Sequence, residues 1–278
     1  MIVTRFAPSP TGQLHLGHAA SALFTFNLAQ KDGGKFLLRI EDIDPVRCRD
    51  VYSDDILEDL HWLGLSWQAP VRKQSQHMKD YANALDQLRE RRLIYPCFCT
   101  RREVLEEAKA AGHAPHEGEE GPVYSGTCRH LTEEQRDEKS KSRQAVWRLD
   151  MKKALALTGS LSWHDSARGA IEVCPERFGD VVLARRDVAA SYHLCVTLDD
   201  ASQGITLVTR GEDLMASTDI HVVLQKLLGL PTPTYHHHPL LLDVQGKRFA
   251  KRDKAVTIRA LRGAGMTPEE VRQKAIFS

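Results

Sequence analysis

Apolar stretches alternate with helix-like stretches along the first quarter of the chain. A buried strand is expected over residues 2–6 and an alanine-rich helix over 18–29, and the prolines and glycine between them break regular structure. A second strand at 36–40 precedes a second helix at 54–63, where leucine and isoleucine recur at helical spacing. Strands and helices in this order imply a parallel sheet covered by helices, so the predicted fold class is α/β.

The pattern changes in the middle of the chain. Residues 97–174 are charged and punctuated by glycine, and Thr132 with Gln135 has the spacing of a capping box that opens a helix. Because this composition differs from the sheet-like sequence on either side, we interpret residues 97–174 as an insertion.

Sheet-like sequence returns after the insertion. Strands are expected at 181–184, 195–198 and 205–208, followed by an apolar helix at 220–228. A last helix is expected to open at Thr267, which stands three residues before a glutamate. The sheet is therefore predicted to be completed by residues far from its first strands.

Composition and charge limit the classes of protein to which the chain can belong. The 278 residues are 42% hydrophobic and 27% charged, which is ordinary for a globular protein. No apolar run approaches the roughly 20 residues of a membrane span, and the N-terminus lacks a secretory signal, so a cytoplasmic location is expected. The formal net charge is only +1, so any contact with RNA must come from local patches of charge.

The segment between the first strand and the first helix has the features of an anion site. It reads P-S-P-T-G-Q-L-H-L-G-H, from Pro8 to His18. Free backbone N–H groups at a helix start favour a phosphate, Gly17 permits a close approach, and His15 and His18 can face one polyphosphate. Two histidines alone are more often ordinary polar residues; their position directly after the first strand favours the phosphate site.

Further blocks occur in the order found in a known enzyme family. R-F-A-P-S-P-T-G begins at Arg5, R-I-E-D-I-D-P at Arg39, and R-G-E-D at Arg210 after the pair Asp199-Asp200. Together with H-L-G-H they resemble the class I glutamyl- and glutaminyl-tRNA synthetases, over residues 1 to about 255. The family's catalytic loop usually reads K-M-S-K-S or K-L-S-K, whereas residues 248–252 read R-F-A-K-R, so only the second lysine of the loop, Lys251, is kept.

This resemblance implies an architecture. We expect a class I synthetase fold with a Rossmann-like parallel sheet, an inserted zinc-containing subdomain and a small C-terminal helical part. The expected segments are the first half of the catalytic domain (1–96), the inserted acceptor- and zinc-binding subdomain (97–174), the second half of the catalytic domain (175–243), and the catalytic loop with a C-terminal helix (244–278).

The resemblance also implies the chemistry of the site. Such enzymes join an amino acid to the α-phosphate of ATP with Mg²⁺ on the phosphates, by positioning and electrostatics and without a general base. A glutamate side chain needs a cationic partner, which Arg5 and Arg210 can supply. The implied glutamate-binding residues are Arg5, Ala7, Ser9, Glu41 for the amino group, Tyr192 and Arg210. The implied ATP-binding residues are His15, Gly17, His18 and Lys251, with His15, His18 and Lys251 as catalytic residues.

Three cysteines in the predicted insertion suggest a metal. Cys97, Cys99 and Cys128 would supply three thiolates to a tetrahedral Zn²⁺, a structural site if protein fills all four positions. Soft-ligand chemistry favours His130 as the fourth ligand, whereas Tyr124 to Cys128 resembles the Y-x-x-x-C of shorter glutamate-specific relatives; we choose Tyr124. The competing interpretation is three buried cysteines without metal.

The run His236-His237-His238 also invites a metal interpretation. Consecutive residues on a strand point to alternate faces, and the run leads into Pro239 and three leucines. We therefore predict the start of a strand here.

The acceptor is inferred from the position of the catalytic loop. Full-length glutamyl-tRNA synthetases continue past it into a long helical domain that reads the anticodon, whereas this sequence ends soon after Arg252, so no anticodon-binding domain is expected. This resembles the glutamyl-Q tRNA(Asp) synthetases, which attach glutamate to the queuosine base in the anticodon of tRNA(Asp). The alternatives are a minimal glutamyl-tRNA synthetase that charges the 3′ end of tRNA(Glu), and an inactive RNA-binding relative. A monomer is expected.

Overall fold

The computed structural model of the chain describes residues 1–31, 33–110, 123–241 and 256–276. Within these residues no helix has the length and apolar character needed to cross a membrane. The elements, in chain order, are β1 (Val3–Phe6), α1 (Leu16–Lys31), β2 (Lys35–Ile40), α2 (Asp50–Trp62), β3 (Gln68–Lys73), η1 (Gln74–His77), α3 (Met78–Glu90), β4 (Ile94–Cys97), α4 (Arg101–Ala110), α5 (Glu133–Ser140), β5 (Val146–Leu149), α6 (Met151–Thr158), β6 (Ser162–Asp165), β7 (Gly169–Glu172), η2 (Pro175–Phe178), β8 (Val182–Ala184), α7 (Tyr192–Ser202), β9 (Leu207–Gly211), η3 (Glu212–Leu214), α8 (Thr218–Leu228), β10 (Thr234–His238), α9 (Ile258–Gly263) and α10 (Pro268–Lys274).

A parallel sheet of β1, β2 and β3 forms the first half of the fold. α1 connects β1 to β2 and packs on them with its alanine-rich face, which includes Ala19, Ala22 and Ala29. The turn after α1 requires glycine at position 34, since a Cβ there would lie 2.4 Å from the carbonyl oxygen of Ile2. This close approach lets β2 enter the sheet directly beside β1.

A second sheet, in the order β7-β6-β10-β9, lies next to the first. β10 runs parallel to both β9 and β6, while β7 folds back on β6. Val3 of β1 is joined to Thr206, just before β9, by hydrogen bonds of 2.9 Å in each direction. The parallel strands of both halves are therefore neighbours through β1 and β9, as a Rossmann-like sheet requires.

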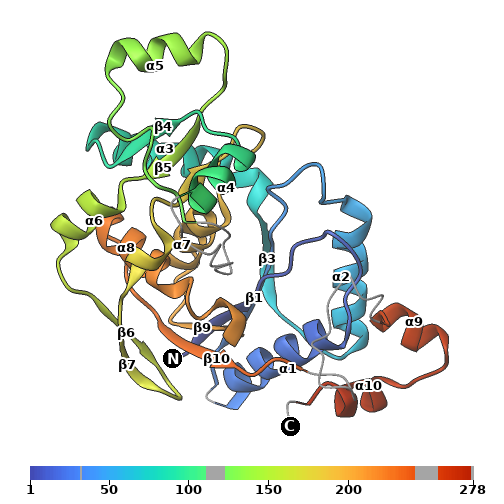
Figure 1. Ribbon diagram of the computed structural model, residues 1–278. Helices are drawn as coiled ribbons and strands as arrows, with labels where there is room; N and C mark the ends of the chain where they lie inside the picture. Colours follow the sequence, from blue (N-terminus) through green and yellow to red (C-terminus); the bar gives the residue numbers. More distant parts are fainter. Residues whose placement is uncertain (32, 111–122, 242–255, 277–278) are drawn as a thin grey trace.

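A third, antiparallel sheet consists of β4, β5 and β8. In Figure 1 it lies with α4 and α5 at one end of the molecule, whereas α9 and α10 lie at the other end beside α1 and α2. Its strands lie between residues 94 and 184, while β6, inside the predicted insertion, pairs with β10. The division into four segments stays a prediction.

Most elements expected from the sequence are confirmed within a few residues. The capping boxes at Thr132 and Thr267 are present. The histidine run lies in a strand as expected, but it forms the last three residues of β10 and not the start of a strand, because Thr234 and Tyr235 already pair with β9. The strand expected at 195–198 is wrong, because these residues belong to α7. The Ser191 side chain caps that helix by accepting from the N–H of Leu194, and the helix is buried on most sides, so its apolar run imitates a buried strand.

The C-terminal half of α7 brings two carboxylates beneath the parallel sheets. Asp199 accepts hydrogen bonds from Arg72 of β3, Gln74 of η1 and Tyr81 of α3. Asp200 accepts from Arg39 of β2 at 2.8 Å and from Arg5 of β1 at 2.8 Å. A set of buried ion pairs thus joins α7 to β1, β2 and β3.

Arg39→Met should destabilise the protein strongly, because the fully buried guanidinium of Arg39 pairs with Asp200 and with Glu41. Removal of one partner from a buried pair typically costs about 3 to 5 kcal/mol. Arg102→Met is the control, because Arg102 is 84% exposed and its ion pair is with Glu106 on the same helix surface. Urea unfolding measures both variants. A loss below about 1 kcal/mol for Arg39→Met would contradict the structural role assigned to this network.

Candidate active site

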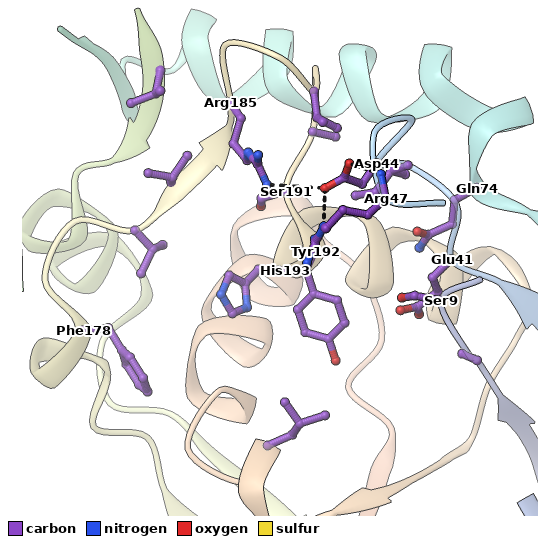
Figure 2. A pocket seen from close by; sticks show the side chains of 18 of the residues that line it. Ser9, Glu41, Asp44, Arg47, Gln74, Phe178, Arg185, Ser191, Tyr192 and His193 are labelled. Carbon is purple, nitrogen blue, oxygen red and sulfur yellow. Dashed lines mark hydrogen bonds and ion pairs between the residues drawn. The ribbon is translucent and has the colours of Figure 1, made fainter. Parts of the chain in front are cut away.

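A cleft of about 1690 Å³ opens at the carboxyl ends of β1, β2 and β9. One wall comes from the loop after β1 and from residues that follow β2, and the opposite wall comes from the antiparallel sheet and the segment that leads into α7. Figure 2 shows Glu41 and Ser9 on one side of this cleft, with Tyr192 and His193 beside them. Ligands of open parallel sheets bind at this edge, so the cleft is the candidate active site.

The two histidines of the first loop are brought together at the start of α1. Their rings lie 3.8 Å apart between centroids. Nδ1 of His18 accepts from the N–H of His15 at 3.2 Å, and Nδ1 of His15 accepts from the N–H of Gly17 at 3.1 Å. Each neutral ring therefore carries its proton on Nε2, which makes that nitrogen a hydrogen-bond donor suited to a phosphate oxygen.

Arg5, Arg39 and Asp200 form a buried charge cluster near β1 and β2. We call this cluster the floor, and of its three residues Arg5 is the one that lines the cleft. Arg5 donates to both carboxylate oxygens of Asp200, at 2.8 and 3.3 Å, and to the carbonyl oxygen of Thr209. Burial alone would raise the pKa of Asp200, but the guanidinium groups of Arg5 and Arg39 outweigh it and hold that pKa below its usual value. The charge of Arg5 is therefore already compensated within the protein.

Glu41 lies beside this floor with its carboxylate on the cleft. The side chain is buried, and its Oε1 accepts from Arg39 at 3.2 Å. Burial raises the pKa of Glu41 above its usual value although the charges of Arg39 and Arg5 oppose the change. A ligand ammonium group that reached this carboxylate would favour its ionised form.

Arg210 differs from Arg5 in the partners that surround it. It donates to His237 at 3.2 Å, to His221 at 3.1 Å and to the hydroxyl of Thr218 at 2.5 Å. Within the described part of the chain it has no ion pair with a carboxylate. Arg210 is buried and lines the cleft, so it presents a cationic group that has no ion pair with a described carboxylate.

The structure gathers most of the residues that the sequence singled out. Arg5, Ala7, Ser9, His18, Glu41, Tyr192 and Arg210 all line this one cleft. Residue 251 and the rest of the basic loop at 248–252 lie outside the described residues. The roles of these residues in binding and catalysis stay predictions.

Cys97, Cys99 and Cys128 form a cluster at one wall of the cleft, with their sulfur atoms within 4.8 Å of one another. Sγ of Cys99 lies 3.6 Å from Sγ of Cys128 and 3.5 Å from the hydroxyl oxygen of Tyr124. A tetrahedral Zn²⁺ with bonds of about 2.3 Å to sulfur and about 2.0 Å to oxygen separates two sulfurs by about 3.8 Å, and sulfur from oxygen by about 3.5 Å. The three cysteines could therefore hold a metal ion, and the distance from Cys99 to Tyr124 is compatible with a fourth ligand there, which stays a prediction. His130 is exposed and does not belong to the cluster.

The partners of Arg210 are not evident from the sequence. His221 lies in the apolar helix α8, and the sequence around His237 indicates only a strand. Strand alternation predicts that His237 and His236 face opposite sides, but nothing local in the sequence shows that β10 and α8 converge on β9. These partners are separated from Arg210 by 27 and 11 residues.

Comparison with known proteins identifies the family of this chain. Residues 1–276 match the family described as tRNA synthetases class I (E and Q), catalytic domain. The chain is 47% identical to a glutamyl-Q tRNA(Asp) synthetase of Rhodobacter capsulatus, over 98% of this chain and 99% of that relative. It is also 39% identical to a glutamate--tRNA ligase of Aquifex aeolicus, over 96% of this chain but 55% of that relative.

A solved structure has the same fold. The glutamate tRNA ligase from Elizabethkingia meningosepticum, crystallised in complex with its amino acid, superimposes with a TM-score of 0.74 at 31% sequence identity. The match covers 91% of this chain and 52% of that one. This chain therefore shares its fold with about half of a synthetase of known structure.

Proposed function

Because this chain belongs to the class I tRNA synthetases for glutamate and glutamine, and to the branch named glutamyl-Q tRNA(Asp) synthetase within it, we propose that it activates L-glutamate with ATP and transfers it to the queuosine base of tRNA(Asp). One observation carries the proposal: the same cleft is lined by His18, at a helix start suited to a phosphate, and by Arg210, a guanidinium without a carboxylate partner among the described residues. The chain is also similar to that branch along nearly its full length.

The cleft residues support recognition of glutamate. In this proposal Glu41 binds the ammonium group, Arg210 binds the side-chain carboxylate, and Ala7, Ser9, Tyr192 and Arg5 shape the space between them. A carboxylate accepts two N–H groups of a guanidinium in parallel, which fixes its position as well as its charge. The α-carboxylate is then left to react.

The first reaction joins the α-carboxylate to the nucleotide. A carboxylate oxygen forms a bond to the α-phosphorus of ATP while the bond from that phosphorus to the bridging oxygen breaks, and pyrophosphate leaves with the electron pair. Nε2–H groups of His15 and His18, with the N-terminus of α1, would stabilise charge on the phosphates. Mg²⁺ would enter with ATP on its phosphate oxygens, and Lys251 stays a predicted partner of the same phosphates.

Local charge supports an RNA partner although the net charge is small. A groove of about 1060 Å³ runs beside α3, α5 and β5 and shares Arg185 and Arg186 with the cleft. Eight basic and four acidic side chains line it. An RNA backbone in this groove would lead a splayed base toward the cleft, because RNA loops present bases that duplexes hide.

The acceptor is tested by transfer of labelled glutamate to three purified RNAs: tRNA(Glu), tRNA(Asp) that carries queuosine, and tRNA(Asp) that carries guanosine at the same position. We expect labelling of the queuosine-containing tRNA(Asp) alone, because the modified base carries the nucleophile. Efficient labelling of tRNA(Glu) would instead identify a minimal glutamyl-tRNA synthetase. Equal labelling of the two forms of tRNA(Asp) would also contradict the proposal.

We further propose a structural Zn²⁺ held by Cys97, Cys99, Tyr124 and Cys128. Besides the distances between these groups, the guanidinium of Arg148 in β5 lies 4.0 Å from the ring centroid of Tyr124, which holds the ring in place. When bound, the ion would cross-link the start of the antiparallel sheet to residues 124–128. All four positions would be filled by protein, so the ion would have no open position for a substrate.

Metal analysis should find about one zinc per chain in protein purified without chelators and with zinc supplied. Cys97→Ser should lose the metal, and Tyr124→Phe should weaken zinc affinity sharply, whereas His130→Ala should bind zinc like the unchanged protein. Competition with a chromogenic chelator measures the affinities. Wild-type protein without zinc under these conditions would show that the cysteines are core residues, and loss of zinc in His130→Ala alone would exclude Tyr124 as the ligand.

A further inference from the structure

The two arginines expected at the glutamate carboxylate are not equivalent in charge. Arg5 forms a two-point ion pair with Asp200. Arg210 has only uncharged acceptors among the described residues: two imidazoles and a hydroxyl. A buried charge without a counter-ion is costly, and the cost falls when a carboxylate binds. Arg210 is therefore the stronger anion receptor of the two.

The hydrogen bonds around Arg210 fix the tautomers of its histidines. A guanidinium can only donate, so His237 Nε2 and His221 Nδ1 accept from it. The other nitrogen of His237 then donates to Asp165, Nδ1 to Oδ2 at 2.8 Å, and the backbone N–H of His237 donates to the same oxygen. Nε2 of His221 donates to Nδ1 of His193 at 3.1 Å. Each ring is thus held as a neutral acceptor by a partner on its far side.

The surroundings also keep these two rings uncharged. Burial, followed by the charge of Arg210, lowers the pKa of His237 to about 4, although Asp165 opposes the change. Burial and the charge of Arg210 lower the pKa of His221 well below its usual value. At neutral pH neither ring adds positive charge beside Arg210, and neither removes the charge of Arg210 as a carboxylate would.

The remaining donors of Arg210 match a carboxylate. Its five N–H groups supply three bonds to His237, His221 and Thr218, one from each nitrogen. One N–H remains on each of the two terminal nitrogens, and both can donate to a carboxylate. An amide has one oxygen and an NH₂ group, and the NH₂ group would face a donor.

We propose that His221 and His237 are positioning residues that set the preference for an amino acid with an anionic side chain. Their neutral rings fix the guanidinium of Arg210 at the cleft and leave the positive charge of Arg210 available to the ligand. This rests on the proposed activation of glutamate. The two histidines act through Arg210 and do not touch the amino acid themselves. Asp165 fixes the tautomer of His237, and His193 accepts from His221.

Two matched variants test the role of His221. Asparagine places its side-chain oxygen near the position of Nδ1, which faces Arg210, whereas glutamine places its amide near the position of Nε2, which faces His193. The assay is amino-acid-dependent exchange of labelled pyrophosphate into ATP, with KM and kcat determined for glutamate and for glutamine. His236→Leu is the control, because His236 lies on the same strand as His237 and its ring bonds Ser166, whereas the hydrogen bonds of Arg210 to described residues go to His237, His221 and Thr218.

We expect His221→Gln to raise the KM for glutamate about 10- to 100-fold with a smaller change in kcat and in the KM for ATP. The ratio of kcat/KM for glutamate over glutamine should fall by a similar factor, because binding of the neutral amide gains little from the charge of Arg210. His221→Asn should keep most of the wild-type ratio, and His236→Leu should keep it fully.

Equal ratios in wild type, His221→Asn and His221→Gln would overturn the positioning role while leaving the proposed function intact. A fall of the ratio in His221→Asn as large as in His221→Gln would also overturn it, since the acceptor toward Arg210 would then be irrelevant. Absence of glutamate-dependent exchange in the wild-type protein would contradict the proposed function itself, and the inference with it.

Discussion

One carboxylate, Asp200, is shared by two buried guanidinium groups, and the architecture of the cleft depends on it. Arg5 comes from β1 and Arg39 from β2, while Asp200 comes from α7 in the second half of the chain. Burial would by itself raise the pKa of Asp200, so only the two positive charges keep it ionised. The pairing joins the two halves of the chain directly beneath the cleft.

The same pairing decides what the cleft can attract. Because Asp200 compensates Arg5 and Arg39 also pairs with Glu41, the floor is close to electrically balanced. Glu41 still presents a carboxylate for an ammonium group, and Arg210 still presents a guanidinium held by neutral groups. Negative and positive groups at separate places in one cleft match an amino acid whose side chain is anionic, which is the basis of the assignment to glutamate.

The predicted zinc cluster lies at the wall of the cleft opposite Glu41. Cys99 and Tyr124 line the cleft, while Cys97 and Cys128 are buried behind them. Arg148 stacks on Tyr124 and donates to the carbonyl oxygen of Asp180, just before β8. A bound zinc would therefore stiffen the wall that leads to the basic groove, without a part in the chemistry.

Local patterns in the sequence predict most of the helices and strands. They do not predict contacts between residues that are far apart in the sequence and meet only in the folded protein. Strand and helix positions around β1, α1 and β2 follow from periodicity, and the loop that carries His15 and His18 follows β1 as expected. α7 was mistaken for a strand because it is apolar on most sides. The histidines around Arg210 could not be found from spacing, because β9, β10 and α8 meet only in the folded sheet. Tyr124 was chosen by resemblance, and its distance to Cys99 agrees with that choice.

The central claim is that the charge of Arg210 selects the substrate. Titration calorimetry of glutamate and glutamine with wild-type protein and with Arg210→Gln measures the coupling between this side chain and the ligand carboxylate. We expect wild type to favour glutamate by roughly 2 to 4 kcal/mol and the variant to lose most of that preference. A variant that still prefers glutamate by the wild-type margin would contradict the account.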